Sequence, residues 1–308
     1  MTYKNFLINN FRDYIPLFSN RVFFNFFNIS GFIKNILIYG GYLPALWGPS
    51  LNITTLLIFN LPLDFRIIFI SFLLPLIAYN YDYYKDLEKD AETNPERANF
   101  LNKKRSQQLN ILYIALMVVL LIWVFKLALM VFVMVLMVLS LLYNSVLKGF
   151  TKKIAAFKNL YLAFMWGSWG TFLIVLSQIS LFDISLIYLF LYICTKVMAN
   201  TMFFDIKDIE SDKKAGLKTM PVILGKNGTL VFLKGLNLFT LFILVSGVLF
   251  KFLHPLSLSL AIFNGYTLFY LKIGYGNIGI LSSKSYIADL EAIFYPCTLW
   301  IIKSFMVG

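Results

Sequence analysis

Long apolar runs separated by short polar breaks are the main pattern along this chain. Nine runs are predicted as helices, approximately at 35–59, 64–85, 107–126, 127–147, 155–179, 184–206, 229–250, 254–273 and 285–304. Each approaches or exceeds the ~20 apolar residues that an α-helix needs to cross a bilayer core of roughly 30 Å. The pattern therefore predicts an all-α membrane protein with nine transmembrane helices.

Composition supports this class. Of the 308 residues, 59% are hydrophobic and 14% are charged, whereas soluble domains carry about 25% charged residues. A soluble fold can bury one or two such helices but not nine in succession. We expect residues 1–308 to form one transmembrane domain without a soluble linker. The pattern of residues 1–30 predicts an interfacial amphipathic segment rather than a cleavable signal peptide.

Cysteine and histidine exclude several kinds of site. The two cysteines, Cys194 and Cys297, are far apart in sequence, so the chain has no CxxC pair. The single histidine, His254, lies in a short predicted loop. The sequence thus argues against a disulfide framework, a zinc site and a histidine-based triad.

The basic residues indicate orientation. Of the 27 lysines and arginines, 22 precede the first predicted span or follow the second, fourth, sixth and eighth. Because cytoplasmic loops carry the excess of basic residues, this asymmetry places the N-terminus and those loops in the cytoplasm. The net charge of +12 needs no nucleic-acid partner to explain it.

Acidic residues are concentrated in two segments on that same side. Residues 82–105 and 205–226 hold ten of the fifteen acids. In the first segment, Asp82, Asp86 and Asp90 recur every four residues and share one helical stripe. In the second, Asp205, Asp208 and Asp212 also share a face.

Like charges at these spacings repel one another. A hard divalent cation relieves the repulsion, and Mg²⁺ prefers carboxylate and phosphate oxygens. One such cluster is readily explained as a solvated, charge-rich helix end. Two clusters on one membrane side, each where an apolar span ends, favour a magnesium-bridged diphosphate site.

Basic and aromatic residues accompany the clusters. The candidate diphosphate ligands are Arg97 after the first cluster, Lys148 and Lys158 in the loop after the fourth span, and Lys218 after the second cluster. Each lysine is also explained by the positive-inside bias, whereas the planar guanidinium of Arg97 suits phosphate oxygens best. Aromatic faces can stabilise a carbocation, and the flanking candidates are Tyr79, Tyr83, Tyr84, Tyr143, Phe203 and Phe204.

Two residues inside spans are unusual. Pro75 removes a backbone hydrogen bond from the second span. Lys196 lies nine residues before Asp205, roughly 13 Å along the helix. A charge at that depth is costly, so we expect it to face the bundle interior and to bind a partner or substrate.

The motifs resemble those of the UbiA superfamily of intramembrane prenyltransferases. The second cluster and its tail, from Asp205 to Gly225, are similar to that family's second aspartate-rich motif. The first is altered, since Asp82 and Tyr83 stand where the family usually shows Asn-Asp. The downstream Asn94-Pro95-Glu96-Arg97 fits the family pattern, and the segment from Tyr143 to Lys148 matches more weakly.

The resemblance implies nine helices around a central cavity, a Mg²⁺ cofactor, and ionisation of an allylic prenyl diphosphate followed by attack of an acceptor. The candidate catalytic residues are Asp86, Asp208 and Tyr143, together with Lys196 because of its depth in a span, and all six aspartates of the clusters are the candidate metal ligands. Membrane lipids surround the protein, and no obligate protein partner is implied.

Three alternatives stay open from sequence. The open acceptor classes are an aromatic acid or quinone precursor, a haem, a tocopherol-type ring and a polar lipid headgroup, and aromatic acceptors lead only because they are the commonest in the family. A membrane terpene cyclase would ionise the same donor without an acceptor. An ion transporter could also use acidic residues, although transporters usually bind near the bilayer midplane and these aspartates lie at helix ends.

Overall fold

A computed structural model describes residues 35–85, 87–88, 95–101, 103–178, 183–276 and 286–307. Throughout this part of the chain the regular structure is helical. The predicted interfacial segment 1–30 and the metal candidates Asp86 and Asp90 lie outside the described residues.

The helices follow the predicted spans closely. In chain order they are α3 (Tyr42–Ala45), α4 (Trp47–Ile58), α5 (Phe65–Lys85), α7 (Pro95–Phe100), α8 (Lys103–Val124), α9 (Leu127–Ser145), η1 (Leu147–Lys152), α10 (Phe157–Gln178), α11 (Ile184–Asp205), η2 (Ile206–Asp208), α12 (Ile209–Lys214), α13 (Met220–Leu249), η3 (Pro255–Ala261), α14 (Ile262–Gly274), α16 (Tyr286–Ile293) and α17 (Tyr295–Val307).

Six helical segments in the described residues are long and apolar enough to cross a membrane. They comprise α5, α8, α10, α11 with its continuation, α13, and η3 with α14. The apolar helix α9 is shorter, and α16 and α17 divide the last predicted span into two pieces. The all-helical membrane class is thereby confirmed, while the count of nine spans stays a prediction.

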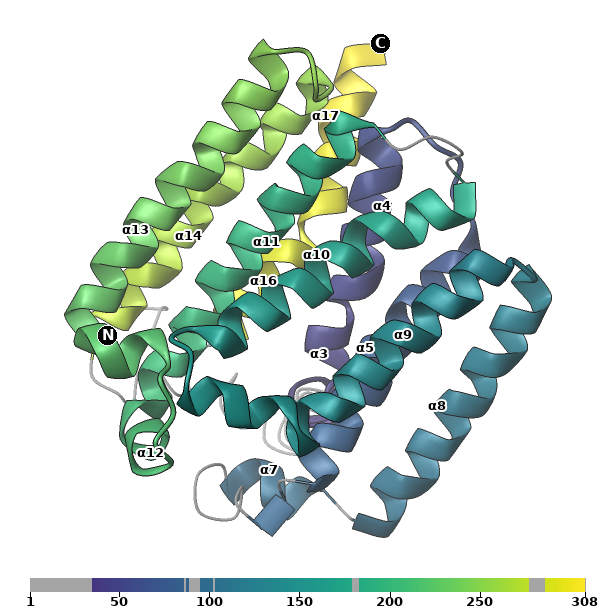
Figure 1. Cartoon of the computed structure of the whole chain (residues 1–308). Coiled ribbons are helices and arrows are strands. Elements are labelled where there is room, and N and C mark those ends of the chain that lie inside the picture. The colour runs from purple at the N-terminus through teal and green to yellow at the C-terminus, as the bar shows by residue number, and fades with distance from the viewer. Residues whose placement is uncertain are drawn as a thin grey trace, which may run out of the picture.

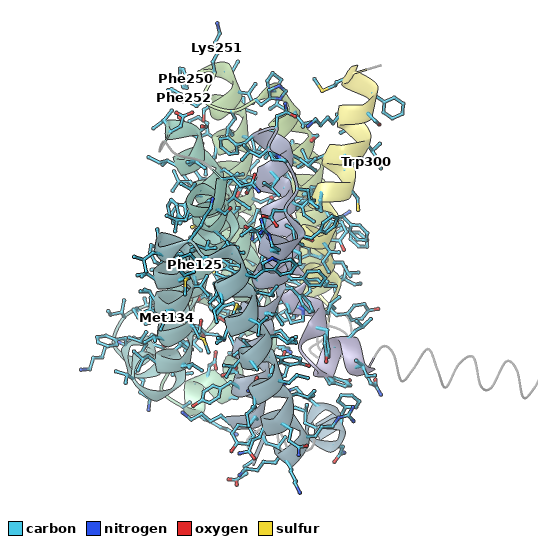
Figure 2. All side chains as sticks on the ribbon, turned by 90° about the vertical axis from the view of Figure 1, so that its right-hand side faces the viewer. Phe125, Met134, Phe250, Lys251, Phe252 and Trp300 are labelled. Carbon is cyan, nitrogen blue, oxygen red and sulfur yellow. The ribbon has the colours of Figure 1, made fainter. Side chains whose placement is uncertain are left out.

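The outer surface of the bundle is apolar. Phe125, Met134 and Trp300 expose 81%, 60% and 65% of their area. Figure 2 shows these side chains together with Phe250, Lys251 and Phe252, which lie at one end of the bundle beyond α13. A soluble protein rarely exposes so many large apolar side chains in one continuous surface, so the surface suits lipid contact.

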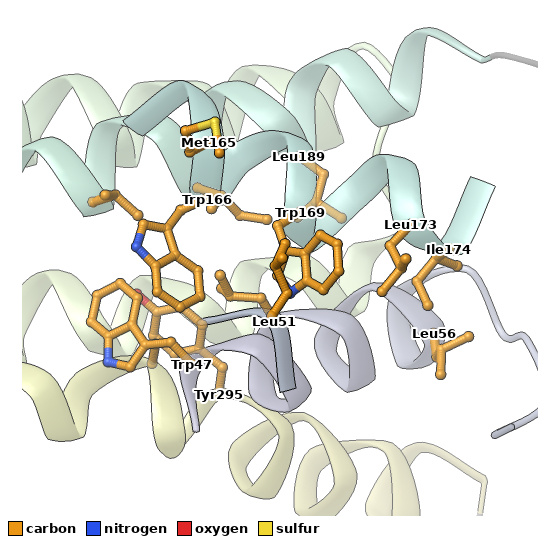
Figure 3. Packing of buried hydrophobic residues seen from close by; sticks show 14 of the residues in the cluster. Trp47, Leu51, Leu56, Met165, Trp166, Trp169, Leu173, Ile174, Leu189 and Tyr295 are labelled. Atoms are coloured by element: carbon orange, nitrogen blue, oxygen red, sulfur yellow. The ribbon is translucent and has the colours of Figure 1, made fainter. Parts of the chain in front are cut away.

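Aromatic and aliphatic side chains from α4, α10, α11 and α17 form part of the core, to which α5, α8 and α9 also contribute. Trp47, Trp166 and Trp169 are each at most 9% exposed, and Figure 3 shows them packed among Leu51, Leu173 and Leu189. The indole rings of Trp47 and Trp166 have centroids 6.0 Å apart.

A proline in α5 determines how three helices meet. Pro75 has no N–H, so it cannot donate the helical hydrogen bond to the Ser71 carbonyl. The indole Nε1 of Trp169 in α10 donates to that carbonyl instead, at 2.9 Å. A Cβ at Gly48 of α4 would come within 1.9 Å of the same oxygen. Glycine is therefore required where α4 crosses α5.

The short helices α7 and α12 lie at the same end of the bundle (Figure 1). This end holds the C-terminal end of α5, which carries Asp82, and the C-terminal end of α11, which carries Asp205. The fold thus brings to one side of the membrane the two acidic segments that the sequence separates by more than a hundred residues.

Candidate active site

Asp205 is buried at the end of α11 and has two polar partners from α10. Its Oδ1 lies 2.5 Å from Lys158 Nζ, and its Oδ2 accepts a hydrogen bond of 2.8 Å from Asn159 Nδ2. The carboxyl group is 2% exposed, whereas the Lys158 side chain is 30% exposed. The ion pair therefore holds a buried carboxylate at the boundary between the bundle and its polar end.

Asp208 and Asp212 follow on η2 and α12. Asp208 occupies the position before the first turn of α12, and Asp212 is 6% exposed. The hydroxyl of Thr219 donates to Asp212 Oδ2 at 3.1 Å. This contact depends on a tight turn after α12, in which Gly216 adopts φ +70° and Leu217 N–H donates to the Asp212 carbonyl at 2.9 Å.

The second cluster is electrostatically suited to a cation. Asp212 interacts electrostatically with the like charges of Asp205 and Asp208 and with the opposite charge of Lys158. A divalent cation bound to these oxygens would relieve that repulsion.

The described residues contain no preformed group of three or more acidic, histidine or cysteine side chains placed to hold a metal ion. The donor chemistry nevertheless fits Mg²⁺, because it consists of carboxylate oxygens and leaves room in the metal's coordination for water and phosphate. Two of the predicted ligands, Asp86 and Asp90, are outside the described part of the chain.

The first cluster begins with Asp82 in the last turn of α5. Its neighbour Tyr83, which stands where the related motifs carry an aspartate, has a cationic partner: the guanidinium carbon of Arg97 lies 4.3 Å from the centre of the Tyr83 ring. This distance is within the range of a cation–π interaction. Tyr83 thus holds the predicted diphosphate ligand Arg97 against the last turn of α5.

Tyr143 connects the two clusters. Its hydroxyl interacts electrostatically with Asp82 of α5 and with Asp205 of α11, and also with Lys158. Its ring stacks on Tyr161 with centroids 4.9 Å apart. One described aspartate of each motif, Asp82 and Asp205, is therefore within electrostatic range of Tyr143, at the end of the bundle where Figure 1 shows α7 and α12.

The remaining basic candidates differ in placement. Lys158 belongs to the first turn of α10 and not to a loop, so the loop assignment was wrong; the helix begins at Phe157, directly after Ala156, whose N–H pairs with the Lys218 carbonyl at 2.9 Å. Lys148 lies in η1, and its side chain is outside the described structure. Lys218 is exposed and its Nζ lies 3.4 Å from the Lys153 carbonyl.

Lys196 faces the bundle interior, as expected from its depth. Its Nζ lies 2.7 Å from Glu291 Oε1, 2.9 Å from Thr267 Oγ1 and 3.0 Å from the Phe263 carbonyl. An ammonium has three protons to donate, and these contacts use all three. The geometry gives Lys196 a structural role in the bundle, while its catalytic role stays a prediction.

Sequence reasoning missed three residues near the site, namely Asn159, Asn200 and Asp289. Asp289 of α16 interacts electrostatically with Lys207 and lies beside the Asn200 amide. The sequence did contain a sign of Asp289, because it lies inside the predicted span 285–304. Burying its charge there is as costly as burying that of Lys196, so the side chain should face the bundle interior. The asparagines gave no such signal.

An all-helical bundle with an apolar outer surface and several helices long enough to cross a membrane defines the class of helical membrane proteins. The match to a family model is more specific: residues 41–277 match the UbiA prenyltransferase family. The chain belongs to this family, and it is an intramembrane prenyltransferase.

Solved structures support the fold. A UbiA homologue from Aeropyrum pernix K1 aligns over 85% of this chain and 98% of its own, with TM-score 0.66 and 14% identity. A UbiA homologue from Archaeoglobus fulgidus, solved with GPP and Mg²⁺, aligns over 85% and 98%, with TM-score 0.58 and 15% identity. A digeranylgeranylglyceryl phosphate synthase aligns over 89% and 97%, with TM-score 0.55 and 17% identity. No curated protein matches by sequence.

Proposed function

We infer that this enzyme transfers an isoprenoid chain from an allylic prenyl diphosphate to an acceptor and requires Mg²⁺. The observation that carries the inference is the position of Tyr143, which interacts with Asp82 of one motif and Asp205 of the other. Two acidic helix ends around one region are what a diphosphate bridged by metal ions needs. The Archaeoglobus fulgidus homologues solved with GPP or DMAPP and Mg²⁺ support this assignment.

In this proposal each group of residues has its own role. Asp205, Asp208, Asp212 and Asp82 hold Mg²⁺ together with the predicted ligands Asp86 and Asp90. Bound Mg²⁺ offsets the charge that develops on the departing diphosphate. Arg97, Lys148, Lys158 and Lys218 supply further positive charge. The aromatic faces of Tyr79, Tyr83 and Tyr143 stabilise the allylic cation.

The acceptor belongs to one of two chemical classes, an aromatic quinone precursor or a lipid. The aligned digeranylgeranylglyceryl phosphate synthase supports a lipid acceptor, whereas aromatic acceptors are favoured by their frequency in the family. The excess of basic residues on the active-site side supports a cytoplasmic position for this end of the bundle, where the diphosphate of the donor is accessible from water.

One reconstitution experiment tests the proposal. Purified protein in nanodiscs is incubated with labelled dimethylallyl, geranyl, farnesyl or geranylgeranyl diphosphate, with Mg²⁺ or with EDTA. The acceptor panel contains 4-hydroxybenzoate, 1,4-dihydroxy-2-naphthoate and a glycerol lipid with one free hydroxyl. Mg²⁺-dependent diphosphate release with a prenylated product is expected. Release with only hydrocarbon would indicate a cyclase, and no release with any donor would refute the proposed function.

A further inference from the structure

A pocket lies at the end of the bundle opposite the active site. It has a volume of about 690 Å³ and is lined by residues 61–66 between α4 and α5, by Trp123 of α8 and by Gln178 of α10. Arg66 lies in the first turn of α5 and Asp82 in its last, which separates the pocket from the first acidic cluster by roughly 24 Å along the helix. The pocket therefore belongs to the other membrane boundary.

Three segments that are distant in sequence meet at this pocket. Among them, α8 is held by the fewest neighbours, because only 17% of its apolar stretch is buried, against 50% for α5 and 56% for α10. A ligand in the pocket would contact all three segments. It would thereby join the end of α8 to the two better-packed helices.

The side chains of the pocket offer mainly hydrogen-bond donors. The guanidinium of Arg66 uses Nε and Nη2 to bind Asp64, at 3.0 Å and 2.8 Å, which leaves three of its five N–H groups for other acceptors. The Trp123 ring, whose centre is 5.8 Å from the guanidinium carbon, has an indole N–H, and the Gln178 amide has two N–H groups. The Oε1 of Gln178 is buried without a donor among the described residues. This set of donors suits a ligand with anionic oxygens.

Basic residues gather around the pocket. Lys126 Nζ donates to the Ser177 carbonyl and Lys303 Nζ donates to Asn60 Oδ1, and each of these acceptors is the sequence neighbour of a pocket residue. With Arg66, these lysines are three of the four basic residues that the predicted spans assign to this side of the membrane. The positive-inside bias favours basic residues on the other side, so it does not explain why three of them meet here.

The acids at this end do not cancel that positive charge. Asp64 is engaged by Arg66, and Asp183 accepts a hydrogen bond of 2.6 Å from the Ser185 hydroxyl at the start of α11. Three cationic side chains are thus matched by two acidic ones. The remaining positive charge favours an anion over a neutral or cationic ligand.

The surroundings of the pocket select the kind of anion. Leu63, Phe65 and Trp123 expose 45%, 69% and 66% of their area. Exposed tryptophan beside cationic side chains is typical of the membrane interface, where lipid headgroups lie. A phospholipid would place its phosphate on the guanidinium and its acyl chains on these apolar side chains, whereas a free phosphate would use only the first of these contacts.

We propose that this pocket binds the headgroup of an anionic phospholipid in the leaflet opposite the active site. Arg66 binds the phosphate, with the N–H groups of Trp123 and Gln178 as further donors. Because the lipid contacts the ends of α5, α8 and α10 together, it stabilises the folded bundle.

A binding experiment on the full chain tests the proposal without any need for turnover. Delipidated protein in detergent is titrated with dioctanoyl phosphatidylglycerol, dioctanoyl phosphatidylcholine or inorganic phosphate, and bound lipid is counted by native mass spectrometry. The thermal unfolding midpoint should rise more with phosphatidylglycerol than with phosphatidylcholine or phosphate, since a ligand that binds only the native state stabilises it. A phosphatidylglycerol with a photoreactive headgroup should label the peptide that contains Trp123.

Variants assign the binding to the pocket. Arg66→Gln should weaken phosphatidylglycerol binding about fivefold, and Trp123→Leu should weaken it while leaving the guanidinium in place. Asp64→Asn removes the acid that competes for Arg66, so it should bind the lipid at least as tightly as wild type. If the ion pair between Asp64 and Arg66 were only structural, both of its variants would lose binding together.

The control is Lys251→Gln, which removes one positive charge beyond α13 (Figure 2) and should keep the wild-type response to phosphatidylglycerol. An equal response in Arg66→Gln and Lys251→Gln would overturn the proposal. It would also be overturned if phosphatidylcholine bound as well as phosphatidylglycerol, or if inorganic phosphate raised the midpoint as much as the lipid does.

Discussion

Lys196 Nζ lies 2.7 Å from Glu291 Oε1 in the interior of the bundle, and the two side chains are 2% and 1% exposed. The pair joins α11 to α16. Glu291 Oε1 also accepts from Thr267 of α14 at 3.1 Å and from the Tyr295 hydroxyl at 3.3 Å. This one carboxylate oxygen of α16 therefore binds side chains from three other helices, α11, α14 and α17.

Removing one partner of this pair should destabilise the protein strongly. Lys196→Met leaves the Glu291 charge buried without compensation, which costs about 3–5 kcal/mol in comparable cases. We expect a large fall in the midpoint of thermal unfolding in detergent. The double variant Lys196→Met/Glu291→Leu removes both charges and should recover much of that loss. Equal midpoints for wild type and Lys196→Met would contradict the prediction.

Trp169 should be needed for the stability of the bundle, because Pro75 leaves the Ser71 carbonyl without its helical hydrogen-bond donor. Trp169→Phe removes the substitute hydrogen bond of 2.9 Å and leaves a buried acceptor unpaired, at a cost of about 1–3 kcal/mol. Adding Pro75→Ala restores an N–H to α5, so the double variant should be less destabilised than Trp169→Phe. Thermal unfolding of the four proteins measures this coupling, and strict additivity would contradict it.

Arg97 and Tyr83 should act together in donor binding. Tyr83→Phe keeps the ring 4.3 Å from the guanidinium and removes only the hydroxyl that hydrogen-bonds to Arg97, so the KM for the prenyl diphosphate should rise less than in Tyr83→Ala. Tyr83→Ala removes the ring and should raise KM toward the value of Arg97→Ala. For Arg97→Ala we expect an increase of about 10- to 100-fold, because hydrogen bonds to charged groups contribute about 1.5–3 kcal/mol. An equal effect of Tyr83→Phe and Tyr83→Ala would exclude the ring as the cause.

Sequence predicted the fold class and the acidic helix ends because both follow from local patterns. A run of apolar residues predicts a membrane span. The spacing of Asp205, Asp208 and Asp212 puts them on one helical face regardless of which residues pack against that helix. The partners of these groups depend on contacts across the bundle. Lys196 signalled a missing partner, but only packing identified Glu291, and nothing local distinguished Asn159 or Asn200 from ordinary polar residues in helices.

The place of Lys158 in the first turn of α10 has the same origin. The start of that helix is fixed by hydrogen bonds between two segments, in which Lys218 N–H donates to Thr151 and Ala156 N–H donates to Lys218. Sequence periodicity contains no information about such pairing. The predicted span 155–179 includes Lys158, but periodicity could not show that the lysine lies against Asp205.

The metal assignment is tested by the second motif, whose aspartates the structure describes. Asp208→Ala should abolish Mg²⁺-dependent diphosphate release while the unfolding midpoint stays near wild type, since Asp208 is only partly buried. Asp86→Ala should do the same if the first motif supplies the other ligands.

Loss of one ligand weakens metal binding, so raising the Mg²⁺ concentration should recover more activity in Asp208→Asn, which keeps one oxygen donor, than in Asp208→Ala. Isothermal titration with Mg²⁺ and a non-hydrolysable geranyl diphosphate analogue measures binding directly. Near wild-type turnover in both alanine variants would refute the magnesium assignment.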